Sequence, residues 1–234
     1  MNHSICLFGD SIAKGVSFDA VHQKYTLLKN SFPNLLQEKG GLSISNFAKF
    51  GCTAGKGLDI IRQKKEKLQN YDFTALEFGG NDCDFDWQDI SDHGEGEYTP
   101  KTPLSLFKEV YCQMVDEIRS AGSQPILLSL PPIDAKRYFA WISKGKSPEN
   151  ILKWIGDVEH IYRWHEMYNL VAFEVSREKS VPIINITNRF LENHHYQTFI
   201  CEDGIHLNEK GHQLVYEALS AFIRQHEPIV SLAV

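Results

Sequence analysis

Three residues, one near the start of this chain and two near its end, have the side chains that acyl transfer to a serine requires. A serine hydroxyl becomes an effective nucleophile when a nearby imidazole takes its proton, and a carboxylate bonded to the other ring nitrogen fixes the histidine tautomer. Ser11 is the candidate nucleophile, His206 the candidate base, and Asp203, three residues before it, the candidate carboxylate. These residue types predict a hydrolase that forms a covalent intermediate on serine.

Two further residues, Gly51 and Asn81, supply the hydrogen-bond donors that such a reaction needs. The oxyanion that forms when serine attacks a carbonyl group is stabilised by donors placed around it. A glycine presents its backbone N–H without a side chain that obstructs the substrate, and an asparagine amide donates a second hydrogen bond. Together with the N–H of Ser11, Gly51 and Asn81 form the candidate oxyanion hole.

The elements that must position these residues follow from hydrophobic patterning. Short apolar runs are typical of parallel strands buried on both faces, and they occur at residues 5–8, 42–47, 73–78, 126–130 and 182–186. Between them, apolar residues recur every three or four positions, which predicts helices. We expect one helix capped by Ser105 with Gly122 just past its end, one from Pro148 to Lys179, and a last one capped by Asn208.

This alternation of strands and helices predicts an α/β fold with three layers, in which helices cover both faces of a five-stranded, mainly parallel sheet. In such folds ligands bind at the carboxyl ends of the strands. Ser11, Gly51, Asn81 and the segment from Asp203 to His206 each follow one of the predicted strands. We therefore expect them to meet at one edge of the sheet.

Each of these residues also has an ordinary structural explanation. Asp10 or Ser11 can cap a following helix, Gly51 and Asn81 are typical of tight turns, and the segment from Asp203 can form a surface turn. Capping and catalysis are compatible at Ser11, since a residue at a strand-to-helix turn presents its side chain at the sheet edge. The combination of all five residue types at one edge is what favours catalysis.

The motifs also discriminate between types of serine hydrolase. The nucleophile elbow of α/β-hydrolases needs Gly-x-Ser-x-Gly, and Ala13 stands where its second glycine would be. The sequence instead resembles the GDSL or SGNH hydrolases over residue 5 to about residue 219, through the blocks Gly9-Asp10-Ser11-Ile12, Gly51, Gly79-Gly80-Asn81-Asp82 and Asp203-Gly204-Ile205-His206. Ile12 replaces the leucine of the family motif, a swap that conserves volume.

The resemblance implies a flavodoxin-like three-layer fold and hydrolysis of esters or thioesters without a cofactor. It implies that Ser11 is the nucleophile, His206 the base and Asp203 the residue that orients it. The implied oxyanion hole consists of the N–H groups of Ser11 and Gly51 and the amide of Asn81.

Composition excludes several other classes of protein. The chain has 234 residues, so we expect a single domain over residues 1–234. Its 24 basic and 30 acidic residues give a net charge of −6, which argues against nucleic acid as a partner. Five cysteines without a Cys-x-x-Cys pair, together with the histidine spacing, predict neither disulfides nor a metal site. The first residues lack the basic region and the long apolar stretch of a signal peptide, and no apolar run is long enough to span a membrane. We therefore expect a cytoplasmic protein.

Two segments after the third and fourth predicted strands carry the hints about substrate. Residues 82–100 contain seven acidic residues and no Lys or Arg, whereas residues 131–148 are mainly basic. Phe85, Trp87 and Trp141 in these segments are candidate substrate-binding residues. We expect the segments to meet as a partial lid over the site, the alternative being two independent solvated loops.

The sequence thus predicts a serine esterase that acts on a small-molecule ester, with small acyl esters or acetylated carbohydrate as the favoured substrates. A thioesterase or a lysophospholipase would use the same residues. A non-catalytic module that binds a ligand or a carbohydrate on the same scaffold is the alternative from another class.

Overall fold

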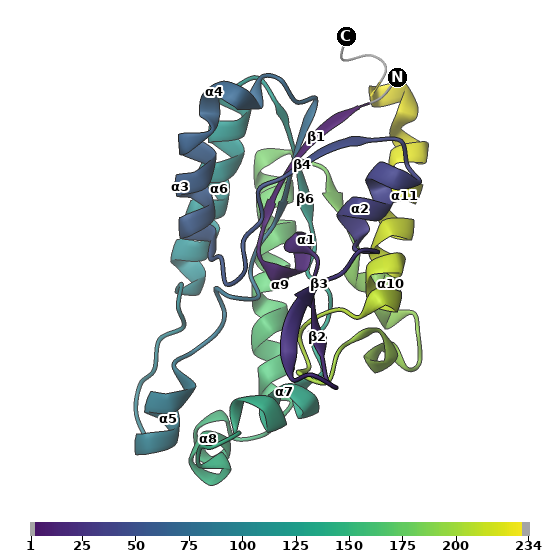
Figure 1. Ribbon diagram of the computed structural model, residues 1–234. Helices are drawn as coiled ribbons and strands as arrows, with labels where there is room; N and C mark the ends of the chain where they lie inside the picture. Colours follow the sequence, from purple (N-terminus) through teal and green to yellow (C-terminus); the bar gives the residue numbers. More distant parts are fainter. Residues whose placement is uncertain (1–2, 231–234) are drawn as a thin grey trace.

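A five-stranded parallel sheet forms the centre of the molecule, whose computed structural model describes residues 3–230 (Figure 1). The strands lie in the order β4-β1-β5-β6-β7. Their bounds are β1 Ser4–Gly9, β4 Ser43–Asn46, β5 Phe73–Glu77, β6 Gln124–Leu128 and β7 Ile183–Ile184. All five coincide with the apolar runs of the sequence, which confirms the predicted fold class.

The order of the strands determines where a site can form. Numbered by chain order within this sheet, the strands run 2-1-3-4-5, the flavodoxin-like arrangement of doubly wound folds. The chain leaves β1 toward one side of the sheet to form β4 and later returns to the other side of β1 to form β5. A crevice opens at the carboxyl ends of β1 and β5, where the winding changes direction. The residues that follow these two strands include Ser11 and Asn81.

Helices cover both faces of the sheet, as the three-layer prediction requires. Their apolar sides pack on the strands in two separate hydrophobic cores, one on each face. One face carries α3 Ala54–Gln63, α4 Lys65–Leu68, α6 Leu104–Ser120 and α9 His160–Lys179. The opposite face carries α1 Ser11–Lys14, α2 Phe32–Glu38, α10 Thr187–Leu191, the short 3₁₀ helix η1 Tyr196–Phe199 and α11 Glu209–Val230 (Figure 1).

A third apolar cluster lies beyond the carboxyl ends of the strands, at the lower end of Figure 1. It is built by three short helices that the segments after β5 and β6 contribute, together with the first turns of α9. These helices are α5 Trp87–His93, α7 Ala135–Ile142 and α8 Pro148–Ile155. The cluster forms an extension of the molecule on the same side as the crevice.

Two of the predicted helix boundaries were wrong. The stretch from Pro148 to Lys179 is not one helix but two, because the chain ends α8 at Gly156, whose φ of 77° lies in the left-handed region that glycine tolerates. The long helix α6 begins at Leu104, so Ser105 lies in its first turn and does not cap it. Asn208 does cap α11, since its Oδ1 accepts a hydrogen bond from the N–H of Gly211 at 3.1 Å.

A small antiparallel hairpin that was not predicted follows α1; its strands are β2 Val16–Asp19 and β3 Lys24–Leu27. Each of its strands has only four residues, too few for a clear alternating pattern. The hairpin projects toward the carboxyl end of the sheet (Figure 1). Within residues 3–230, no helix combines the length and the hydropathy needed to cross a membrane.

Candidate active site

Ser11 is placed at the sheet edge by a tight turn at the end of β1. Asp10 caps α1, because its Oδ1 accepts a hydrogen bond from the N–H of Ile12 at 2.8 Å. Ser11 is the first residue of α1 and is 7% exposed. Gly9 is required just before it, since a Cβ there would lie 2.5 Å from Cβ of Ala13 and 2.7 Å from the carbonyl oxygen of Glu77.

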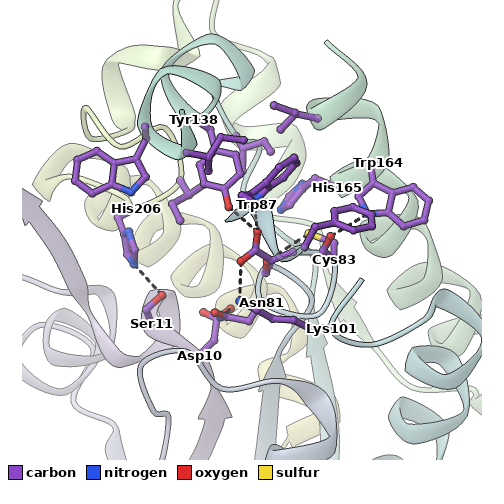
Figure 2. A pocket seen from close by; sticks show the side chains of 18 of the residues that line it. Asp10, Ser11, Asn81, Cys83, Trp87, Lys101, Tyr138, Trp164, His165 and His206 are labelled. Carbon is purple, nitrogen blue, oxygen red and sulfur yellow. Dashed lines mark hydrogen bonds and ion pairs between the residues drawn. The ribbon is translucent and has the colours of Figure 1, made fainter. Parts of the chain in front are cut away.

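His206 lies within hydrogen-bond distance of Ser11 although 195 residues separate them in the chain (Figure 2). Its Nε2 is 2.9 Å from Ser11 Oγ, and its Nδ1 is 2.5 Å from Asp203 Oδ2. The other oxygen of Asp203 accepts from the backbone N–H groups of Ile205 and His206 at 3.2 and 3.1 Å. Ser11, His206 and Asp203 therefore form one continuous hydrogen-bonded chain, the arrangement used by serine nucleophiles.

The charge of Asp203 is maintained by these partners. Its side chain is fully buried, and burial alone would raise the pKa of the carboxyl group. The hydrogen bond and the charge of His206, with the two backbone N–H groups, outweigh that effect and lower the pKa of Asp203 below its ordinary value. The carboxylate stays ionised at neutral pH and can stabilise an imidazolium on His206.

Asn81 and Gly51 line the same cavity as Ser11 and His206. The Asn81 amide is oriented by Asp10, whose Oδ2 accepts from Nδ2 at 2.9 Å. Asp82 links the loop after β5, which contains Asn81, to the start of α3, which follows the loop containing Gly51. Both of its carboxylate oxygens accept from the N–H of Ala54, at 2.9 and 3.1 Å. Gly51 has φ 67°, which favours glycine, and a Cβ there would meet nothing within 4 Å. The structure thus brings together all five residues that the sequence analysis singled out.

A pair of buried carboxyl groups lies directly behind the nucleophile. Glu77 at the end of β5 is the register partner of Gly9, and its Oε2 accepts from the N–H of Ala13 at 3.3 Å. Burial, followed by the charge of Asp10 and a hydrogen bond with it, raises the pKa of Glu77 well above its ordinary value. Burial also raises the pKa of Asp10. The pair therefore retains a proton to a higher pH than a separate glutamate would, with Glu77 as donor to the Asp10 carboxylate.

The cavity at this edge has a volume of about 440 Å³ and extends from Ser11 into the third apolar cluster. The segments 82–100 and 131–148 both line it, and they meet as predicted: Tyr138 donates to Asp84 Oδ1 at 2.8 Å, and Ser91 Oγ accepts from the N–H of Ser147 at 2.8 Å. The donors in these links, the Tyr138 hydroxyl and the Ser147 N–H, are uncharged. The prediction that opposite charge draws the segments together is therefore not supported by these contacts.

The candidate substrate-binding residues divide into two groups. Phe85 and Trp87 lie together deep in the cavity, with ring centroids 5.7 Å apart. Trp141 lies near the mouth, packed on Phe18 at 4.7 Å and 6.3 Å from the ring of Tyr25. The three residues line one cavity at different places along it.

Two aromatic residues over His206 were missed by the sequence analysis. Tyr25, carried by the β2–β3 hairpin, has its ring centroid 4.9 Å from that of His206, and Phe50 stacks on His206 at 5.9 Å with an interplanar angle of 6°. Burial and the negative charge of Asp203 raise the pKa of the Tyr25 hydroxyl. A short hairpin signal, alternating residues on either side of a turn, is the feature that would have found Tyr25.

The two cysteines nearest the site are not nucleophiles. Burial raises the pKa of the Cys52 thiol to about 11 and that of Cys83 well above its ordinary value. A thiol reacts as its thiolate, so both groups are unreactive at neutral pH. The backbone carbonyl of Cys83 has a structural role, since it accepts a hydrogen bond from Nε1 of Trp164 at 2.9 Å.

Comparisons with known proteins agree with this geometry. A sequence model of the GDSL-like lipase/acylhydrolase family matches residues 7–214. The chain is 25% identical over 234 aligned positions to the uncharacterized lipoprotein YqeF of Bacillus subtilis (strain 168), covering 92% of this chain and 87% of that protein. It is 23% identical over 181 positions to the GDSL esterase/lipase WDL1 of Oryza sativa subsp. japonica, covering 76% of this chain but only 64% of the rice protein. The crystal structure of a lipase/acylhydrolase from Enterococcus faecalis shares the fold, with a TM-score of 0.68 over 97% of both chains at 20% identity.

Proposed function

This chain belongs to the GDSL-like lipase/acylhydrolase family and is a carboxylic ester hydrolase, and we propose that it acts through a covalent acyl-enzyme on Ser11. The observation that carries the proposal is the 2.9 Å distance between Ser11 Oγ and His206 Nε2, with His206 Nδ1 bonded to Asp203. A nucleophile, its base and the group that orients the base are thereby aligned.

In the first half of the reaction, Ser11 Oγ attacks the ester carbonyl carbon while His206 Nε2 takes the hydroxyl proton. The negative charge that develops on the carbonyl oxygen is stabilised by the N–H groups of Ser11 and Gly51 and by the Asn81 amide. The tetrahedral intermediate then collapses. The bond to the alcohol oxygen breaks, and His206 gives its proton to the departing alcohol.

In the second half, a water molecule takes the place of the alcohol. His206 removes a proton from the water as its oxygen attacks the acyl carbon, and the same oxyanion hole stabilises the second tetrahedral intermediate. Collapse of that intermediate breaks the bond to Ser11 Oγ, which recovers the proton from His206. A carboxylic acid leaves, and the enzyme returns to its starting state.

The substrates that we propose are esters of small acids, including acetylated carbohydrate. A cavity of about 440 Å³ with many aromatic side chains accommodates a compact acyl group. The alcohol part has to lie beside His206, where Phe50 is 56% exposed. A polar alcohol as bulky as a sugar can therefore remain at the open mouth while its acyl group is enclosed.

Hydrolysis of an ester panel by the wild type and by Ser11→Ala tests this function. We expect acetate and butyrate esters to be hydrolysed, and the variant to lose about 10⁶ in kcat, the loss typical of a missing serine nucleophile. The panel includes a thioester and a lysophospholipid, so that a preference for either identifies the corresponding alternative. Equal rates for Ser11→Ala and wild type would overturn the proposal.

A further inference from the structure

The inner part of the cavity has a chemical character that ester hydrolysis itself does not require. Four aromatic rings and one imidazole surround it, and we call this part the aromatic chamber: Phe85, Trp87, Trp154, Trp164 and His165. Phe85 packs against the tryptophans, with ring centroids 4.8 Å from Trp154 and 5.6 Å from Trp164. The rings meet at steep or tilted angles, as packed aromatic side chains usually do, and together they line this end of the cavity.

The polar groups around the aromatic chamber are mostly bonded to one another. Asp84 accepts from Nε1 of Trp87 at 2.7 Å and from Tyr138, and it forms an ion pair with Lys101 at 2.7 Å. Trp164 donates its Nε1 to a backbone carbonyl oxygen. These side chains consequently present ring surfaces to the chamber, since their hydrogen-bonding groups are already committed.

His165 differs from its neighbours in this respect. It lines the cavity and is 4% exposed, yet no described residue forms a hydrogen bond with its Nδ1. Burial lowers the pKa of His165 to about 4, so the imidazole is neutral and has one donor and one acceptor nitrogen. A buried polar group without a partner is destabilising, so a ligand hydroxyl that reached this nitrogen from the cavity would supply the missing hydrogen bond.

The position of His165 is fixed by the fold. Asn169, one turn further along α9, accepts from the N–H of Leu130 at 2.8 Å and so anchors the helix to the segment that follows β6. Residues four apart lie on the same face of a helix, so His165 lies on the face of α9 that Asn169 anchors. In Figure 2, His165 and Trp164 lie on one side of the cavity and His206 with Ser11 on the other.

This separation assigns the chamber to the acyl half of an ester. The leaving alcohol oxygen has to lie beside His206 to receive its proton, and the ring surfaces there, Tyr25 and Phe50, are partly exposed. The acyl substituent leaves the reacting carbon in a different direction from the alcohol. The enclosed chamber, on the opposite side from His206, is the space available to it.

We propose that the aromatic chamber is the acyl-binding subsite for carboxylic esters whose acyl group carries a planar ring with a hydroxyl group on its far side, bonded to His165. The ring faces would stack on the walls formed by Phe85 and Trp154, and a hydroxyl matches a neutral imidazole because it both donates and accepts. A straight alkyl chain would leave His165 without a partner, and a carboxylate at that end would find no positive charge on it. The proposal rests on the proposed function of Ser11.

Ethyl esters with different acyl groups test the subsite, because the leaving group stays constant. We expect kcat/KM for ethyl 4-hydroxycinnamate to exceed that for ethyl cinnamate about tenfold, the effect of one added buried hydrogen bond. In His165→Phe, which keeps a ring and removes both nitrogens, the ratio of the two kcat/KM values should fall to about one. His194→Phe is the matched control: it is exposed and outside the cavity, so it should keep the wild-type ratio.

The ratio of the two kcat/KM values is taken within one protein sample. A variant that contains less active enzyme lowers both values equally, so the ratio is unaffected. Similar kcat/KM values for the two ring esters in the wild type, a ratio that survives in His165→Phe, or a preference for ethyl octanoate over both would overturn the subsite. Hydrolysis of ethyl acetate that depends on Ser11, without any of these ring effects, would contradict the subsite and leave the proposed function standing.

Binding without turnover supplies a second readout that does not depend on catalysis. In a Ser11→Ala background, ethyl 4-hydroxycinnamate should quench the fluorescence of the chamber tryptophans and bind about tenfold more tightly than ethyl cinnamate. Adding His165→Phe should abolish that difference. Equal affinities in the Ser11→Ala background would overturn the subsite even if no ester were hydrolysed by the wild type.

Discussion

Asn81 Nδ2 lies 2.9 Å from Asp10 Oδ2, so the residue just before the proposed nucleophile orients the proposed oxyanion donor. One amide proton of Asn81 is occupied by Asp10, which leaves the other free to point toward the cavity. The two residues follow neighbouring strands, β1 and β5. Their contact couples the nucleophile turn to the oxyanion hole.

Replacing Asn81 by Ala should therefore lower kcat by about 10²–10³ with little change in KM, the usual effect of losing one oxyanion donor. Steady-state kinetics on an acetate ester measures both constants. Asn46→Ala is the control, since that amide bonds to the backbone of Ala13 and Ala48 and lies outside the cavity. If both variants lose the same activity, Asn81 is a structural residue only.

Asp203→Asn should lower kcat by about 10⁴ while the protein stays folded. The amide can still accept from the backbone N–H of Ile205 and His206, so the loop keeps its hydrogen bonds. It cannot hold His206 in the required tautomer or stabilise the imidazolium. Circular dichroism checks the fold, and a kcat within tenfold of the wild type would remove Asp203 from the proposed triad.

Glu77→Gln should change how stability depends on pH. Burial and the charge of Asp10 raise the pKa of Glu77, so the folded protein keeps a proton that the unfolded chain loses near pH 4.5. Glu77 should thus contribute a decrease in the free energy of unfolding as pH rises above 4.5, of at most about 1.4 kcal/mol per pH unit for one proton.

The glutamine variant cannot lose that proton, and its amide can still donate to Asp10. Its unfolding free energy should fall less steeply than that of the wild type between pH 4.5 and 8, as urea unfolding at several pH values would reveal. Parallel pH profiles for the two proteins would mean that Glu77 does not retain a proton in the folded state.

Gly204→Ala should destabilise the loop that carries His206. Gly204 has φ 83°, and a Cβ there would lie 2.3 Å from the backbone nitrogen of Tyr138 and 2.7 Å from the carbonyl oxygen of Asp134. Backbone strain and overpacking together should cost about 2–4 kcal/mol. Gly145→Ala provides a matched control, because its φ is 70° but nothing lies within 4 Å of the added Cβ. Denaturant unfolding should show a clearly smaller loss for Gly145→Ala, and equal losses would refute the steric explanation.

The sheet was predictable from the sequence because its central strands, such as β1 and β5, are largely buried. Continuous apolar runs such as residues 73–78 identify such strands, and the polar residues that follow them identify the functional edge. Ser11, Gly51, Asn81, Asp203 and His206 were found in this way. Their mutual distances were not predictable, since these depend on the order in which the strands pair.

The parts that were not predicted depend on tertiary contacts. Glu77 lies next to Asp10 because β5 pairs with β1 in a register that places it opposite Gly9. Tyr25 covers His206 because a hairpin of four-residue strands folds over the site. The orientation of His165 requires the packing of α9 on the sheet. The hairpin has only a short local signal, its two four-residue strands on either side of a turn. The other two relationships have none.

Labelling with a fluorophosphonate, followed by peptide mapping, is the sharpest check on Ser11 as the nucleophile, because this reagent modifies a serine activated by a neighbouring base. We expect a single adduct on the peptide that contains Ser11, absent in Ser11→Ala and formed far more slowly in His206→Ala. An adduct on a different residue, or none at all on the folded wild-type protein, would contradict this role of Ser11.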